Sequence, residues 1–267
     1  ANSMEKQIVF LSHGGGPLPL LGDQGHRELV DYLQTLPGTL NRPDAILVIS
    51  AHWEADTPTV TSAPQPGLIY DYYGFPRESY EIAYPCPGSP ELAQQVTQAL
   101  QNAGIDAHRD GERGLDHGVF VPLKLMYPQA NIPCVQLSLD KSLDAALHWR
   151  IGEALQSLEV DRLLVIGSGF SFHNMTAFRA PDDRSAREMN IAFEDWLTNI
   201  CSTEELSESE RRQQLIEWQQ APYARFCHPR EEHLLPLHVC VAMAGRASDA
   251  HASIEVLGKS AGMFHWL

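Results

Sequence analysis

Three histidines each follow a short run of β-branched and leucine residues, at places where a sheet could bring them to one site. They are His13 after Ile8–Leu11, His52 after Ile46–Ile49, and His173 after Leu163–Ile166. Such runs form strands that are buried on both faces. Ligands bind at the carboxyl ends of the strands in open α/β sheets, and imidazole is the commonest side-chain metal ligand. The pattern therefore predicts a metal enzyme.

His13 and His52 are the first candidates for metal ligands, because each directly follows its predicted strand and has small neighbours that let an ion approach. A third ligand is needed, and Glu231-Glu232-His233 offers three choices at the entry to a predicted helix. Two histidines with a carboxylate are usual for non-haem iron, which favours Glu232, whereas three histidines suit zinc. The residues alone leave this choice open.

His117 and His173 stand apart from the ligand candidates and lie in turns of small residues. A histidine that is not tied to a metal and has a pKa near neutrality is the usual general acid or base. Asp116 and Asn174 are their sequence neighbours and could orient them. The sequence thus predicts two histidines that move protons beside the metal site.

Several rival sites lack their signature. The glycines after His13 are not followed by G-x-x-x-x-G-K-[ST], so a phosphate loop is disfavoured. Ser168 lacks the G-x-S-x-G elbow of a serine hydrolase, and no C-x-x-C pair supports a cysteine zinc site. The remaining histidines are expected to be structural or solvated; they are His26, His108, His148, His228, His238, His251 and His265.

Composition limits the partners and the location. The 267 residues carry a formal charge of −15 and have no run of Lys or Arg, which argues against nucleic acid and anionic membrane surfaces. No apolar run approaches the roughly 20 residues of a membrane span. Five scattered cysteines are typical of a reduced, cytoplasmic protein. Residues 1–3 are interpreted as an expression remnant before Met4.

Strand-like and helix-like segments alternate along the chain without a linker or repeat, which predicts one α/β domain over residues 4–267 with a central mixed sheet flanked by helices. Further strands are expected at Val135–Leu139 and Ile254–Leu257. A charged surface helix is expected over residues 203–220, and a loop that enters an apolar helix over 228–244. Residues 55–90 are rich in Pro, Gly and Tyr and predict a functional loop, whose aromatic side chains either line a pocket or pin the loop to the core.

An ordered set of motifs resembles one enzyme family. The motifs are Ser12-His13-Gly14, Ser50-Ala51-His52-Trp53, Gly114-Leu115-Asp116-His117-Gly118, Ser168-Gly169 with His173-Asn174, and Glu232-His233-Leu234-Leu235-Pro236-Leu237. In this order they resemble the class III extradiol ring-cleavage dioxygenases, in the branch similar to DOPA 4,5-dioxygenase. The resemblance spans essentially residues 8–257.

The resemblance implies an enzyme that opens a catechol, DOPA-like or related, beside its hydroxyls with dioxygen at a non-haem ferrous ion. It implies His13, His52 and His233 as metal ligands, with Fe²⁺ as cofactor. A site made only of histidines carries no ligand charge and suits Zn²⁺ equally well. The resemblance further implies His173 as the acid/base and His117 as a second pocket histidine that contacts substrate or oxygen. Arg113, close to His117, is a candidate partner for a substrate carboxylate.

Two other functions remain open on the same residues. The three ligands could serve a zinc hydrolase of small esters or amides through a metal-bound water. The fold implied by the resemblance is also used by a signalling scaffold, so a non-enzymatic interaction protein is the second alternative. The presence of all five histidines favours the enzyme.

Overall fold

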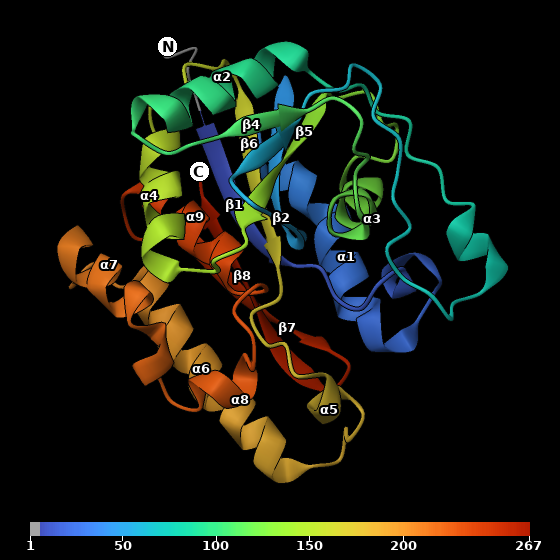
Figure 1. The fold of residues 1–267 in the computed structure, drawn as a ribbon. Helices are drawn as coiled ribbons and strands as arrows, with labels where there is room; N and C mark the ends of the chain where they lie inside the picture. Colours follow the sequence, from blue (N-terminus) through green and yellow to red (C-terminus); the bar gives the residue numbers. More distant parts are fainter. Residues whose placement is uncertain (1–5) are drawn as a thin grey trace.

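The computed structural model describes residues 6–267, which form one mixed sheet of eight strands in the order β4-β3-β5-β2-β6-β1-β8-β7 (Figure 1). The strands are β1 Lys6–Ser12, β2 Ala45–Ala55, β3 Thr59–Thr61, β4 His108–Asp110, β5 Cys134–Asp140, β6 Leu163–Gly169, β7 Ala250–Val256 and β8 Lys259–Trp266. The central strands β5, β2, β6 and β1 run parallel, whereas β3 and β8 pair antiparallel with β5 and β1. The α/β class with a mixed sheet is confirmed.

The carboxyl ends of β1, β2 and β6 lie level with one another. Ser12 pairs with Gly169, and Ser50 pairs with Ser168, so the three strands reach the same edge of the sheet. Their apolar residues are buried on both faces, as the unbroken runs predict. This alignment places the segments that carry His13, His52 and His173 next to one another.

Helices cover both faces of the sheet (Figure 1). The helices are α1 Arg27–Thr35, α2 Pro90–Asn102, α3 His117–Met126, α4 Ala145–Leu155, α5 Met175–Phe178, α6 Arg184–Ser202, α7 Glu208–Ile216, α8 Ala224–Cys227 and α9 Leu235–Ala244. Short 3-10 turns are η1 Leu18–Leu20, η2 Gln24–His26, η3 Leu36–Thr39, η4 Arg77–Tyr80 and η5 Trp218–Gln220. Helices α2, α4, α6 and α9 share one hydrophobic core, and α1 and α3 share the other.

Strand β2 is longer than its apolar run. The predicted strand Ile46–Ile49 continues to Ala55, so His52 lies inside the strand and not after it. Pairing with β6 stops at Ser50, and the register with β5 shifts between Ile49 and Glu54. A bulge of this kind bends a strand and redirects its side chains. The unbroken apolar run ends at Ile49. The prediction from hydrophobic pattern therefore ended the strand there, although the strand continues.

The C-terminal strand predicted at Ile254–Leu257 is one arm of a hairpin. Its second arm, β8, pairs with both β7 and β1. The hairpin turns at Leu257 and Gly258, which both have positive φ angles, 51° and 80°. Two-residue turns with positive φ match the twist of paired strands, but they usually carry Asn-Gly or Asp-Gly. Leu-Gly is a weak turn signal, and β8 was therefore missed.

The charged segment 203–220 is not one surface helix. It contains α7 and the short turn η5, and two of its large side chains are fully buried. Arg211 donates to the carbonyl oxygens of Ile200 and Thr203, and Trp218 is 1% exposed. The charge of Arg211 predicts an exposed side chain. The side chain is buried instead, because backbone carbonyls outside its own helix accept its hydrogen bonds.

Residues 55–90 run over the α1 and α3 side of the sheet, and between the end of β2 and the start of α2 their regular structure is β3 and η4 (Figure 1). Both expectations for the aromatic side chains hold. The hydroxyl of Tyr84 donates to the carbonyl of Tyr127 at 2.9 Å and pins the loop, whereas Tyr72 and Phe75 line a cavity. The loop is therefore both anchored and part of the site.

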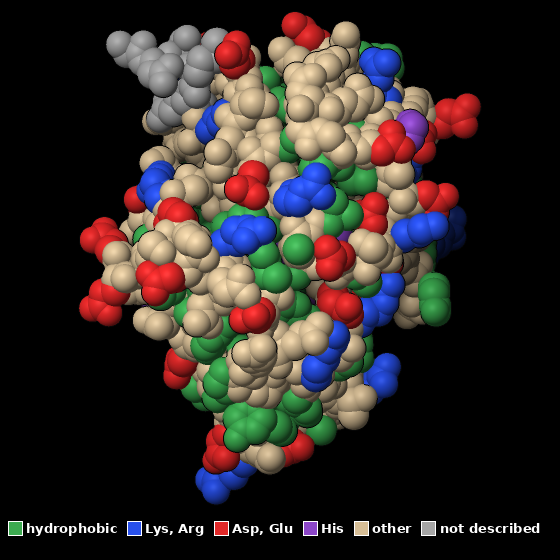
Figure 2. Space-filling model, turned by 60° about the vertical axis from the view of Figure 1, so that its left-hand side comes forward, with side chains coloured by type: hydrophobic (Ala, Val, Ile, Leu, Met, Phe, Trp, Pro, Cys, Tyr) green, Lys and Arg blue, Asp and Glu red, His purple; other side chains and the backbone are tan. Residues whose placement is uncertain are grey.

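The surface and the cysteines complete the description. On the face in Figure 2, basic and acidic side chains are interspersed, and hydrophobic side chains gather at the lower end, where Figure 1 places α5, α6 and α8. All five cysteines are free and buried. None of the helices within residues 6–267 combines the length and apolarity needed to cross a bilayer.

Candidate metal centre

His13 follows β1 directly and is held by a defined hydrogen-bond chain. Its Nδ1 lies 2.9 Å from Oγ of Ser168 on β6, and that hydroxyl donates to the carbonyl of Gly118. A serine hydroxyl has one hydrogen to donate, so Nδ1 of His13 must carry the hydrogen that Ser168 accepts. The lone pair of His13 is therefore on Nε2, the atom that a metal ligand needs to present.

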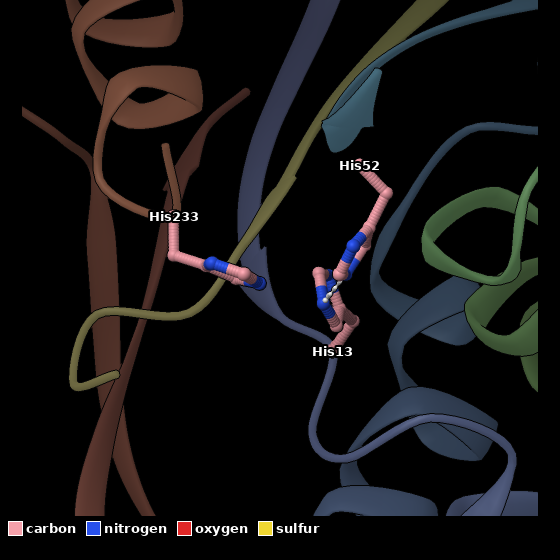
Figure 3. A group of neighbouring side chains, drawn as sticks. All are labelled: His13, His52 and His233. Atoms are coloured by element: carbon pink, nitrogen blue, oxygen red, sulfur yellow. Dashed lines mark hydrogen bonds between the residues drawn. The ribbon is translucent and has the colours of Figure 1, made fainter. Parts of the chain in front are cut away.

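His52 lies in the bulged part of β2, and its side chain points toward Nε2 of His13. Its Nε2 atom lies 3.0 Å from Nε2 of His13 (Figure 3). Metal–imidazole bonds are about 2.0–2.1 Å long, so both nitrogens are close enough to bind one ion. The redirected strand thus provides the second member of the cluster.

His233 approaches from the opposite side, in a turn just before α9 (Figure 3). Its carbonyl oxygen accepts from the backbone N–H of Phe170 at 3.0 Å, which fixes the turn against the end of β6. Gly169 makes this approach possible, because a Cβ atom there would lie 2.3 Å from the same carbonyl oxygen. The ring of His233 points toward His13 and His52, with centroids 5.4 Å and 4.9 Å away.

The chemistry of these three side chains fits a divalent metal ion. One ligand atom from each lies within 4.8 Å of the others. Burial lowers the pKa of all three imidazoles well below the usual value, and the neighbouring histidines lower it further. Neutral imidazole is the form that binds a metal.

Glu232 does not share this position. Its carboxylate groups with His173 and His233 but not with His13 and His52, and it also lies 3.8 Å from Arg230. Burial raises the pKa of this carboxyl, which disfavours its charged form. Of the three candidates in Glu231-Glu232-His233, the geometry favours His233 for the cluster.

His173 and His117 flank the cluster on two sides. The ring of His173 is stacked on that of His233, with centroids 3.6 Å apart and planes 9° apart, and His117 lies 3.9 Å from His52 between ring centroids. Burial lowers the pKa of His173 to about 4, below the near-neutral value expected from the sequence. The imidazole is therefore uncharged at neutral pH and able to accept a proton.

Asp71, which the sequence did not single out, orients His117. Its Oδ1 atom accepts from Nδ1 of His117 at 2.7 Å and from the backbone N–H of the same residue at 3.0 Å. These hydrogen bonds outweigh the burial that opposes ionisation, so the pKa of Asp71 is lowered. With Nδ1 bound to Asp71, Nε2 is the ring nitrogen of His117 that remains for other contacts. No local signal connects the loop residue Asp71 to a partner 46 positions away.

The two orienting residues suggested by sequence adjacency have other tasks. Asp116 caps α3 and accepts from Ser50 and Gln136, whereas Asn174 caps α5 and donates to the carbonyl of Phe226. Neither contacts the neighbouring histidine ring through a hydrogen bond. Side chains of adjacent residues in a turn point in different directions. Adjacency in the sequence therefore did not predict which residue orients each histidine.

We expect Asp71→Asn to lower turnover about 10- to 100-fold, the usual cost of losing an outer partner of a site histidine. The amide removes the negative charge that fixes the His117 tautomer. Turnover and metal content measured on the same sample test this, and metal content should stay near the wild-type level. Asp56→Asn is the matched control, because Asp56 is 90% exposed and pairs only with Lys141 at the surface. Wild-type turnover in Asp71→Asn would contradict the role.

Arg113 is not available to a substrate. Its guanidinium donates to Asp116 at 3.3 Å and to Gln136 at 3.2 Å, and it lies over the ring of Trp53 at 4.2 Å. Only 15% of the side chain is exposed. The proposed pairing with a substrate carboxylate is therefore replaced by an internal ion pair that braces the start of α3.

Of the other histidines, His108 and His251 are exposed, and the rest are buried in structural surroundings. His26, for example, accepts from the backbone N–H of Gly15 at 2.9 Å and binds Asp23 through its other nitrogen. Its ring lies 2.5 Å from the position that a Cβ atom on Gly14 would take, and Gly14 has a φ angle of +78°. The glycine turn after His13 thus packs on His26 while it borders the site cavity.

A cavity of about 300 Å³ opens beside the cluster. Four of the five site histidines line it; they are His52, His117, His173 and His233. The rest of the wall consists of the glycine turn and of apolar or aromatic side chains. The arrangement places uncharged nitrogen ligands and a proton acceptor around one small, apolar space.

Known proteins match this chain over most of its length. A family model described as the catalytic LigB subunit of aromatic ring-opening dioxygenase matches residues 23–267. A dioxygenase of Hapsidospora irregularis is 38% identical, over 97% of this chain and 85% of that protein. The 4,5-DOPA dioxygenase extradiol of Beta vulgaris is 38% identical over 92% and 89%, and that of Escherichia coli (strain K12) is 35% identical over 88% and 84%.

A solved structure has the same fold. The crystal structure of an uncharacterized protein from Escherichia coli K12 superimposes with a TM-score of 0.77 and is 30% identical. The match covers 98% of this chain and 99% of that one.

Proposed function

Because this chain belongs to the LigB family of aromatic ring-opening dioxygenases, as its motifs suggested, we propose that it opens a catechol ring with dioxygen at a metal held by His13, His52 and His233. The observation that carries the proposal is the convergence of three uncharged imidazoles at one edge of the sheet, beside a cavity with two further histidines. Relatives named 4,5-DOPA dioxygenase extradiol support opening beside the hydroxyls.

Ferrous iron is the proposed metal, and when bound it supplies the electron transfer that a catechol needs to react with dioxygen. The protein contributes the ligands, the shape of the cavity and the control of protons. His13 presents its lone pair because Ser168 holds its other nitrogen, and His52 and His233 are kept neutral by burial.

His173 is the proposed acid/base. Since it is uncharged at neutral pH, one of its ring nitrogens can accept the proton of a catechol hydroxyl and later return it. His117, anchored by Asp71, keeps Nε2 for a hydrogen bond to the substrate or to oxygen. The apolar wall excludes water, which strengthens these polar contacts.

The test of the proposal is oxygen uptake by protein reconstituted with ferrous iron, measured across a panel of catechols together with the ultraviolet-visible spectrum of the product. Consumption of dioxygen in step with loss of the catechol spectrum supports ring opening. Absence of uptake with every catechol would refute it. Cytoplasmic location and the residue boundaries 4–267 are part of the same proposal.

We expect the identity of the metal to decide activity. Ferrous iron lies below zinc in the usual affinity order, so purified protein can carry zinc in this neutral site. Zinc has no redox chemistry, and the zinc form should open no catechol. Removal of zinc and addition of ferrous iron without oxygen should restore uptake once oxygen is admitted, with metal content measured at each step.

A zinc hydrolase of small esters or amides is the second candidate, because three neutral histidines also suit a catalytic zinc ion. Hydrolysis by the zinc form, with no gain on addition of iron, would favour the hydrolase over the dioxygenase. The two candidates differ in one direct observable, which is whether dioxygen is consumed.

A further inference from the structure

One ion pair joins the two segments that carry His52 and His233. The guanidinium of Arg230 donates to the carboxylate of Glu54 through both of its terminal nitrogens, at 2.5 Å and 2.6 Å. Glu54 lies two residues after His52 on β2, and Arg230 lies three residues before His233 in the turn that leads into α9. The pair therefore connects segments 176 positions apart in the sequence, close to two of the proposed ligands.

The bulged part of β2 and the turn before α9 each need support at this point. The pairing of β2 with β6 ends at Ser50, and its pairing with β5 resumes at Glu54, so His52 lies in the stretch between. The turn is bound to the end of β6 through the carbonyl of His233. That bond positions the turn against β6, and the ion pair links it directly to β2.

The geometry of the pair is of the kind that restricts orientation. An ion pair at the surface usually contributes little, because water and salt screen it. Here two parallel hydrogen bonds join a planar guanidinium to a planar carboxylate, which fixes the angle between the groups as well as their distance. The side chain of Glu54 is only 25% exposed, although that of Arg230 is 54% exposed.

We propose that Arg230 and Glu54 are positioning residues for the metal centre, whose ion pair holds the turn with His233 against β2 before an ion binds. The inference rests on the proposed ligands His13, His52 and His233. Groups that are ordered before binding lose less conformational freedom when the ligand arrives, so binding is tighter. Loss of the pair should therefore weaken metal binding although neither residue touches the ion.

The direction of the change in Arg230→Gln separates positioning from a simple effect of charge. A positive side chain near a divalent cation repels it. If the pair acted through charge alone, removal of the guanidinium would make metal binding tighter. Positioning predicts the opposite result, because the turn with His233 loses its link to β2.

The test is the zinc affinity of the full chain, measured by competition with a chelator, together with the rate at which zinc dissociates. Arg230→Gln should bind zinc about 3- to 10-fold more weakly, the size of effect expected from one coupled ion pair, mainly through faster dissociation. Arg230→Lys keeps the charge but not the two parallel hydrogen bonds, and it should lie between. Unchanged or tighter binding in both variants would overturn the inference.

A double-mutant cycle tests whether the two residues act as one unit. Glu54→Gln should also weaken zinc binding, and the double variant Glu54→Gln/Arg230→Gln should lose less than the sum of the two single losses, because the same link is broken once. Additive losses would contradict the inference.

Arg225→Gln is the matched control. Arg225 pairs with Glu231 of the same turn at 3.1 Å, but it joins the turn to α8 and not to a strand that carries a ligand. The variant loses the same charge and an ion pair of the same turn, and it should not weaken zinc binding. An equal weakening in Arg225→Gln and Arg230→Gln would show general loosening of the turn and contradict the positioning role.

His233→Ala in the same assay separates failure of this inference from failure of the proposed function. If His233→Ala binds zinc as tightly as the wild type, the proposed metal centre is wrong and the inference falls with it. If His233→Ala loses zinc while Arg230→Gln binds it as the wild type does, only the inference is wrong. Zinc affinity does not depend on ring opening, so a failure to open any catechol leaves this test in force.

Discussion

His233→Ala should yield folded protein that retains almost no metal and consumes no dioxygen. The variant removes one of three imidazoles but keeps the backbone carbonyl that binds the N–H of Phe170, so the turn before α9 can stay in place. With only His13 and His52 left, metal affinity should fall by more than the roughly 10- to 100-fold that loss of an outer partner costs. Metal per chain after dialysis, measured by mass spectrometry, is the readout.

Glu232→Ala is the matched control, because it removes the side chain of the adjacent residue, the rival candidate for the third ligand. It should keep most of its metal, since Glu232 does not cluster with His13 and His52. Circular dichroism and thermal unfolding of both variants separate loss of metal from loss of fold. If Glu232→Ala empties the site while His233→Ala stays loaded, the third ligand is the carboxylate and the assignment is wrong.

His173→Ala should retain its metal and lose turnover by about 10²- to 10⁴-fold, the usual contribution of an acid–base residue. The ring of His173 stacks on His233 but belongs to no cluster with His13 and His52, so its removal leaves the three ligands intact. Without this imidazole the cavity loses the group proposed to accept the proton of the catechol hydroxyl, whereas His117 keeps its proposed hydrogen bond to the substrate or to oxygen. Oxygen uptake and metal content are measured on the same preparation.

His251→Ala controls for removal of a histidine as such, because His251 is exposed on β7 and does not line the cavity. It should match the wild type in both readouts. A fall of metal content in His173→Ala to the level of His13→Ala would make His173 a ligand. Full turnover in His173→Ala would remove it from the mechanism.

The central sheet and the gathering of the histidines were predictable from the sequence. Unbroken apolar runs such as Leu163–Ile166 have few alternatives to a strand buried on both faces, and parallel strands end at one edge. The third ligand needed the family resemblance, because Glu231-Glu232-His233 offers three donors on one turn. The structure selects among them by the direction in which each side chain points.

Other features depend on contacts between distant segments, which periodicity does not encode. Asp71 acquires its role only when residues 55–90 fold over α3, and Arg113 loses its expected role because Asp116 and Gln136 take its hydrogen bonds. The bulge at His52 and the hairpin arm β8 likewise depend on neighbouring strands. The sequence therefore predicted which histidines lie together, but not the residues that hold them in place.

The position of β1 in the sheet has a consequence for biosynthesis. Its two neighbours are β6 and β8, which are translated long after it, and the turn with His233 emerges later than β6. A nascent chain that carries only His13 and His52 has no partner strand for β1 and no third imidazole. Non-local pairings of this kind form late and slowly. The three candidate ligands thus come together only after the chain has been made past His233, and a shorter fragment cannot assemble the cluster.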